Sequence, residues 1–113
     1  MRIVEFDKHR PPILKVPMLD AEETVFHVVP PTVALREELR ARIGDLNALL
    51  SGGNAEIRAT LFDLAARLIS CNRNMKEVTA EDLRKVYGLD EEDMVVFFHA
   101  YADFMSELEH AKN

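Results

Sequence analysis

The positions of the prolines divide this chain into two unlike parts. All five prolines lie at or before residue 31, and the rest of the chain contains none. Because proline fixes the backbone φ angle and lacks an N–H donor, the first part cannot form long helices. We therefore expect a β-rich, proline-containing segment at residues 1–30 and a helical domain at residues 31–113, which together form a single compact unit.

Short runs of β-branched and aromatic residues lie between the prolines. They occur at Ile3–Phe6, Ile13–Val16 and Thr24–Val29, and the last is the strongest because it holds three valines and a phenylalanine. Asp20–Glu23 has the composition of a turn. We expect two or three short strands, including a hairpin. An isolated hairpin is only marginally stable, so it must pack on helices or on another subunit.

Apolar residues after Pro31 recur with the period of an α-helix. A first helix is expected from Thr32 to Leu50, and Gly44 marks a place for a kink or a close approach to another element. A second helix, capped by Asn54, has a wide apolar stripe, which indicates a central position.

Two further helix starts carry local signals. Thr79 is followed three residues later by Asp82, a variant of the capping box, and this short helix should end at Gly88. Asp90 should cap a last helix that continues to about Ala111. The predicted class is α+β and predominantly α, with a short N-terminal hairpin followed by a bundle of about four helices.

The last helix is apolar around much of its circumference, and two interpretations of it are open. It can be the core helix of a small bundle, or it can pack one face in the core and offer another to a partner or sister subunit. Aromatic and methionine side chains suit such contact surfaces. The strand Thr24–Val29 is a second candidate, as a subunit edge. The candidate protein-binding residues are Phe97, Phe98, Tyr101, Phe104, Met105, Val25 and Val28.

Motifs for catalysis and for metal binding are missing from the sequence. Cys71 is the only cysteine, and no two histidines have the spacing of a metal motif. His99 and Asp103 share a helix face, which we interpret as a hydrogen-bonded pair rather than as metal ligands. We expect no catalytic, cofactor-binding or metal-binding residues, and therefore no enzyme.

Charge and hydropathy bear on the partners. The formal net charge is −6, which disfavours nucleic acid as a partner. No apolar run approaches the roughly 20 residues of a membrane span, and the start of the chain lacks a signal peptide pattern, so we expect no membrane association. A cytoplasmic location is expected.

A loosely helix-turn-helix-like arrangement is the basis of the alternative function, a DNA-binding regulator. The loop Asn72–Asn74 and the short helix after Thr79 suggest it, since asparagine and arginine side chains read bases and phosphates. The following helix, however, opens with Asp90–Asp93, and these carboxylates would repel DNA.

The stretch from about Val29 to Glu109 resembles the tail assembly chaperones of siphoviruses and prophages, chiefly those of Gram-positive hosts. The matching segments, in chain order, are Val29–Leu39, Leu68–Asn74, Val78–Leu83 and Phe97–Phe104. They contain the Asn-Arg-Asn loop, the Thr-Ala-Glu-Asp-Leu cap and the late helix rich in Phe and Tyr.

The resemblance implies a role in building a long phage tail. Such chaperones bind and shield the tape measure protein before the tail tube polymerises around it, and they tend to form homo-oligomers. A longer form made by translational frameshifting often recruits the tail tube protein. The resemblance also implies a location in the cytoplasm of the bacterial host and absence from the mature virion.

Overall fold

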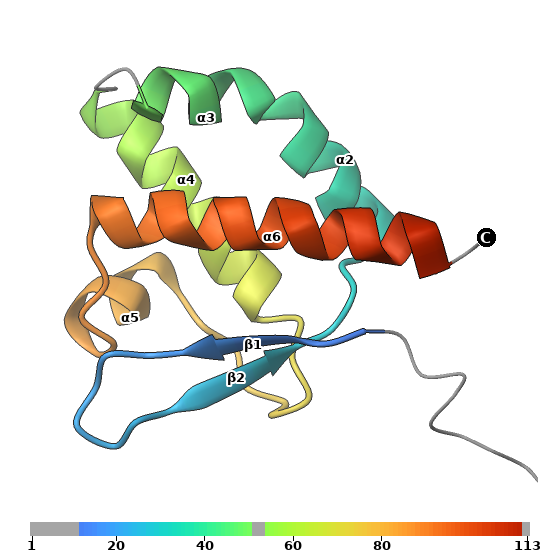
Figure 1. Ribbon diagram of the computed structural model, residues 1–113. Coiled ribbons are helices and arrows are strands. Elements are labelled where there is room, and N and C mark those ends of the chain that lie inside the picture. Colours follow the sequence, from blue (N-terminus) through green and yellow to red (C-terminus); the bar gives the residue numbers. More distant parts are fainter. Residues whose placement is uncertain (1–11, 51–53, 112–113) are drawn as a thin grey trace, which may run out of the picture.

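The structure, a computed structural model, describes residues 12–50 and 54–111 (Figure 1). Over these residues a two-stranded antiparallel hairpin is followed by helices, which confirms the predicted α+β, predominantly helical class. The strand expected at Ile3–Phe6 lies outside the described residues.

The hairpin consists of β1 (Leu14–Pro17) and β2 (Val25–Val28), with Leu14 opposite Val28 and Pro17 opposite Val25. Both strands therefore lie where the β-prone runs predicted them. The turn is fixed by Asp20, whose carboxylate accepts hydrogen bonds from the backbone N–H of Thr24 at 2.9 Å and from its hydroxyl at 2.6 Å. The hydroxyl bond holds the pKa of Asp20 below its ordinary value.

The other edge of β2 is covered by residues 71–74 rather than left free. Val29 donates its N–H to the Cys71 carbonyl at 2.8 Å, and the Arg73 N–H donates to the His27 carbonyl at 2.9 Å. The side chain of Asn74 continues this pairing: its oxygen accepts from the His27 N–H, and its amide donates to the Val25 carbonyl. The expectation that this strand forms a subunit edge is therefore wrong, because both of its sides are already paired.

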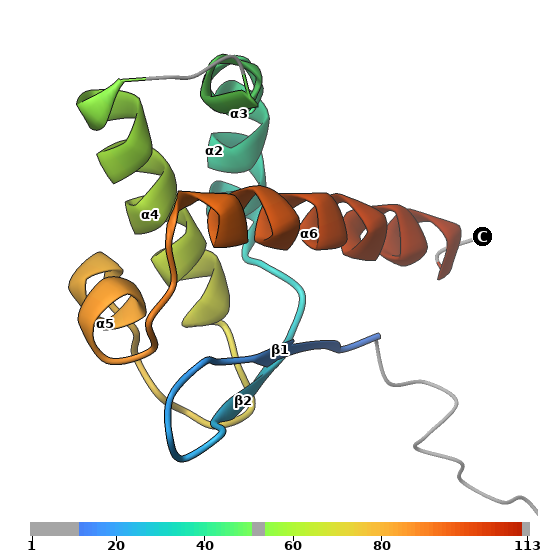
Figure 2. The ribbon, with the colours of Figure 1, turned by 60° about the vertical axis from the view of Figure 1, so that its left-hand side comes forward.

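The first predicted helix is in fact two helices, α2 (Val33–Ala41) and α3 (Ile43–Leu50). The chain changes direction at Arg42, so the two helices form an arch beside α6 (Figures 1 and 2). The Arg42 N–H is shared between the carbonyls of Glu38 and Leu39, as at a helix end. The expected kink therefore occurs at Arg42, two residues before Gly44, which is a poor helix former.

The remaining helices are α4 (Ala55–Ile69), α5 (Ala80–Lys85) and α6 (Glu91–Ala111). Asn54 caps α4 by accepting from the Ile57 N–H at 2.9 Å. The starts of α5 and α6 each carry a reciprocal capping box, formed by Thr79 with Asp82 and by Asp90 with Asp93. These three predicted caps are confirmed.

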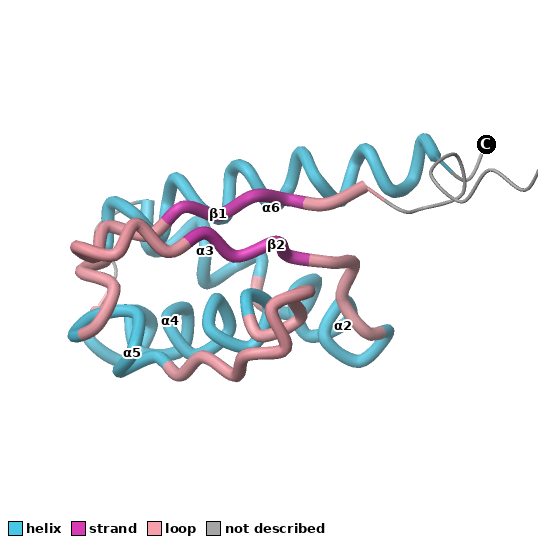
Figure 3. The backbone as a smooth tube through the Cα atoms, turned by 90° about the horizontal axis from the view of Figure 1, so that it is seen from below, coloured by secondary structure: helices cyan, strands magenta, loops and turns pink. Residues whose placement is uncertain are grey.

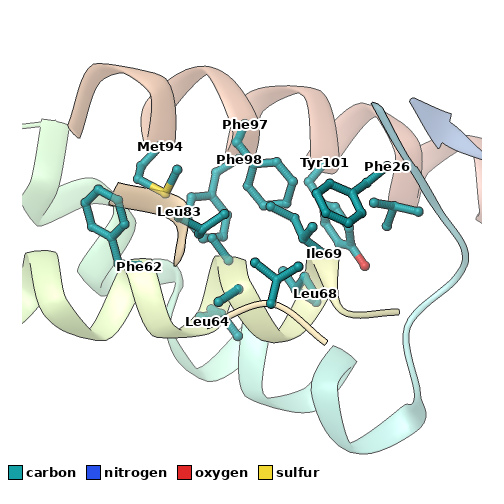
Figure 4. Packing of buried hydrophobic residues seen from close by; sticks show 14 of the residues in the cluster. Phe26, Phe62, Leu64, Leu68, Ile69, Leu83, Met94, Phe97, Phe98 and Tyr101 are labelled. Carbon is teal, nitrogen blue, oxygen red and sulfur yellow. The ribbon is translucent and has the colours of Figure 1, made fainter. Parts of the chain in front are cut away.

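The hairpin and the helices share one hydrophobic core. Seen from the hairpin side in Figure 3, β1 lies over α6, and β2 lies over the space between α6 and α4. Phe26 and Val28 of β2 are fully buried there, and Phe26 packs edge-on against Tyr87 at 5.5 Å between ring centroids. Figure 4 shows side chains of α4 and α6 meeting in this core. Figure 4 labels Phe26, Phe62, Leu64, Leu68, Ile69, Leu83, Met94, Phe97, Phe98 and Tyr101.

Candidate functional site

The aromatic candidates on α6 are core residues. Phe97, Phe98, Tyr101 and Phe104 are each exposed by 7% or less, and Tyr101 is fully buried. Their rings contact one another in sequence along the helix, at centroid distances between 5.2 and 5.6 Å. These four rings therefore fit the first of the two interpretations, that of a core helix.

The remaining candidates are also partly or wholly enclosed. Val28 is fully buried in the core, and Val25 on the same strand is half-buried. Met105 is half-buried beside the core, at a position where α6 meets a groove. Met105 is thus the candidate whose side chain best reaches a surface on which another molecule could lie.

A groove lies between the arch of α2 and α3 and the C-terminal half of α6. We name it the helix-side groove; its volume is about 290 Å³. Its lining combines apolar side chains with charged side chains of both signs. The lining residues are Arg36, Leu39, Arg40, Leu46, Phe98, Tyr101, Ala102, Met105, Ser106 and Glu109.

Two polar atoms that belong to the lining of the helix-side groove have no hydrogen-bond partner. They are the hydroxyl of Tyr101 and the Nε of Arg36, and both atoms are buried. Burial raises the pKa of the Tyr101 phenol well above its ordinary value, while the positive charge of Arg36 opposes that rise. The phenol is therefore neutral at physiological pH, and both atoms have almost no accessible surface.

The helix α2, which forms one wall of the helix-side groove, packs only partly against the hydrophobic core. None of its residues is fully buried, although Leu35 and Leu39 pack partly against the core. Arg67 of α4 donates from both terminal nitrogens to the carboxylate of Glu38 on α2. This bidentate pair lowers the pKa of Glu38 from its ordinary value.

A second groove lies between β1 and the N-terminal half of α6, and we name it the strand-side groove. Its volume is about 200 Å³. Leu19 and Val96 both line it and are strongly exposed, at 66% and 67%. The lining residues are Leu14, Lys15, Val16, Pro17, Leu19, Ile69, Leu89, Asp93, Val96, Phe97 and Ala100.

The outer edge of β1 borders the strand-side groove. The backbone groups of Val25, His27 and Val29 face residues 71–74, so those of Phe26 and Val28 face β1. The backbone groups of Lys15 therefore point away from β2. Lys15 and Pro17, which lacks an N–H, lie two residues apart on this edge, and such residues commonly protect an edge strand against indiscriminate pairing.

The loop Asn72–Asn74, which suggested a DNA-binding regulator, has a structural role. The Asn72 amide donates to the carbonyls of Ile69 and Lys76 at 2.7 and 2.8 Å, and its oxygen accepts from the Lys76 N–H at 3.2 Å. The Asn74 amide is bonded to β2 as described above. Both amides are thus occupied by backbone groups, and neither is available to read a base edge.

Over residues 12–50 and 54–111, no three His, Cys, Asp or Glu side chains come together as a metal-binding group. None of the helices within the same ranges is both long and apolar enough to span a bilayer.

The sequence did not reveal the helix-side groove. Its only local signal is the pair Arg36 and Arg40, which flank Leu39 one turn apart on one helix. Comparisons with protein-family models, with curated proteins and with solved structures find no match for this chain. The resemblance to tail assembly chaperones therefore stays a prediction made from the sequence.

Proposed function

We propose that this chain is a non-enzymatic tail assembly chaperone of a siphovirus or prophage, which binds the tape measure protein and shields it during tail assembly. The observation that supports this proposal best is the helix-side groove. It offers Leu39, Leu46 and Met105 beside a helix, between two walls that are themselves helices. An amphipathic helix binds such a groove by laying its apolar face onto the floor.

The proposed mechanism is reversible burial. A tape measure protein is long and helical, so its apolar stripes are exposed until the tail tube encloses it. Each stripe that enters a groove is removed from water, and burial of one large apolar side chain contributes about 1.5–3 kcal/mol. The chaperone's own charge of −6 keeps loaded complexes apart and limits aggregation.

Co-expression with the neighbouring tape measure gene tests the proposal. The tape measure protein should remain soluble and should co-purify with the wild-type chaperone. Met105→Glu places a charge in the helix-side groove and should abolish co-purification. Met75→Glu is the matched control, because Met75 is 91% exposed and lies outside both grooves. Equal co-purification with both variants, or none with the wild type, would contradict the proposal.

Self-association is the second part of the proposal, and the strand-side groove is its candidate surface. Leu19 and Val96 expose apolar area there on two neighbouring elements. Light scattering at rising protein concentration should detect species larger than a monomer. Val96→Lys should reduce their size, whereas Val86→Lys, at an exposed valine outside both grooves, should not. A strictly monomeric wild-type protein would refute this part.

A further inference from the structure

We infer that copies of this chain associate by strand exchange, in which residues 3–7 of one copy pair with the outer edge of β1 in a second copy. In this pairing Glu5 of the donor lies opposite Lys15 of the acceptor. The inference rests on the self-association part of the proposed function, for which it names the segment that makes the contact. The donated segment lies outside the described residues.

The outer edge of β1 offers backbone groups for a further strand. The backbone groups of Leu14 and Val16 face β2, and those of Lys15 point away from it. Within residues 12–50 and 54–111, no backbone group bonds to the N–H or the carbonyl of Lys15. The edge closes at Leu19, whose N–H donates to the Tyr87 carbonyl at 3.2 Å. Unpaired N–H and C=O groups on a strand edge are a template for the addition of another strand.

Apolar surface lies directly beside this edge, on the side of α6. In Figure 3, β1 lies over α6, and the strand-side groove runs between them. Val96 lines this groove and is 67% exposed, and Ala100 lies one turn further along α6. Successive side chains of a strand point to opposite faces, so every second side chain of an added strand would point towards α6. The added strand therefore needs apolar residues at alternate positions.

The first residues of the chain have the alternation that this edge requires. Val4 and Phe6 are apolar, and Glu5 lies between them. When Val4 and Phe6 point towards α6, Glu5 points to the opposite face, which is also the face of the exposed Lys15 side chain. Opposite charges directly across an antiparallel pair attract each other. The register that places Glu5 opposite Lys15 thus also turns both apolar side chains towards the groove.

Two prolines favour a second copy, rather than the same chain, as the acceptor. To pair with its own β1, the segment would have to reverse direction within residues 8–12, which end in Pro11 and Pro12. Each proline fixes its own φ angle and biases the preceding residue towards an extended conformation. Only Lys8 and His9 are then free to make the turn. Short, strained connections of this kind promote the exchange of an element between copies.

Two charge reversals in the full chain test the inference. Glu5→Lys and Lys15→Glu each place like charges across the pair, so each variant alone should require about a fivefold higher protein concentration to assemble. An equimolar mixture of the two should assemble like the wild type, because each donor then meets an acceptor of opposite charge on the other variant. Glu77→Lys, the same change at an exposed glutamate outside both grooves, should also assemble like the wild type. Light scattering over a concentration series measures all of these samples.

Hydrogen exchange at the Lys15 amide tests the same pairing directly. In the wild-type protein this exchange should become slower as the protein concentration rises, because the amide gains its acceptor only when a second copy binds. In Glu5→Lys the same protection should appear only at the higher concentration at which that variant assembles.

Four results would overturn the inference. They are a wild-type protein that stays monomeric at every concentration, single variants that assemble like the wild type, a mixture that assembles no better than either variant alone, and Lys15 protection that does not depend on concentration. The last result would assign residues 3–7 to their own chain. Assemblies that are insensitive to both reversals would leave the proposed self-association intact. Recovery in the mixture without tape measure binding would refute the chaperone role and support strand exchange.

Discussion

Asn72 and Tyr101 are both buried polar residues, yet the structure treats them in opposite ways. The Asn72 side chain, 7% exposed, makes three hydrogen bonds to backbone groups at the end of α4. The Tyr101 hydroxyl, in a fully buried residue, makes none. Full pairing is the pattern of a group that holds the fold together, whereas an unpaired buried group contributes no hydrogen bond to the stability of the fold.

The surroundings of Asn72 and of Tyr101 also differ in how firmly they are held to the rest of the fold. Residues 71–74 are bonded along β2, so hydrogen bonds join the Asn72 region to the hairpin. The Tyr101 region is bordered by α2, which has no fully buried residue. Stability and binding are therefore expected to respond to mutation at different places, and the following experiments test that separation.

Asn72→Ala should have the largest effect. It removes three hydrogen bonds and leaves the Ile69 and Lys76 backbone groups without partners, so the free energy of unfolding should fall by about 2–4 kcal/mol. Urea denaturation followed by circular dichroism measures this loss. A loss below about 1 kcal/mol would show that water replaces these bonds, and the contrast with Tyr101 would then fail.

Asn74→Ala should cost about 1 kcal/mol, because its two hydrogen bonds to β2 are exposed to solvent. The same denaturation experiment applies, and hydrogen exchange at the His27 amide should become faster. Unchanged protection of that amide would contradict the role of Asn74 as a cover for the β2 edge.

Glu38→Gln should lower stability at neutral pH by less than about 1 kcal/mol, since the Arg67 pair is partly exposed. The pKa of Glu38 is lowered in the folded protein, so this contribution is present above its unfolded-state pKa and disappears as the pH falls through the folded one. Thermal unfolding curves should therefore differ between wild type and variant at neutral pH and converge in acid. Glu37→Gln, its exposed neighbour, serves as the control and should show no such convergence.

Tyr101→Phe should have the smallest effect on stability, from no change to a gain of about 0.5 kcal/mol, because the lost hydroxyl has no partner. Thermal unfolding is the measurement. A loss above about 1 kcal/mol would mean that the hydroxyl is bonded within the fold. Such a loss would mean that Tyr101, like Asn72, stabilises the fold through a hydrogen bond, and the contrast between the two residues would fail.

Local signals made much of the fold predictable from the sequence. The caps at Asn54, Thr79 and Asp90 and both strands of the hairpin depend on neighbouring residues, which a sequence shows directly. The sequence indicates a kink at Gly44, two residues after the break that the structure has at Arg42. The position of a bend also depends on how the two helices of the arch pack.

The candidate site was not predictable in the same way. A helix that is apolar all round can pack on one, two or three sides, and only the fold decides which side chains of α6 are covered. The sequence therefore selected Phe97 and Phe104, which are buried, and passed over Arg36, which lines the helix-side groove. Met105, another candidate protein-binding residue, lines the helix-side groove, and its role in binding stays a prediction.

The shallow attachment of α2 has a consequence for its local stability. Because no residue of this helix is fully buried, it is held by the partly buried Leu35 and Leu39 and by the Glu38–Arg67 pair. Local opening of α2 should therefore cost less free energy than unfolding of the whole domain.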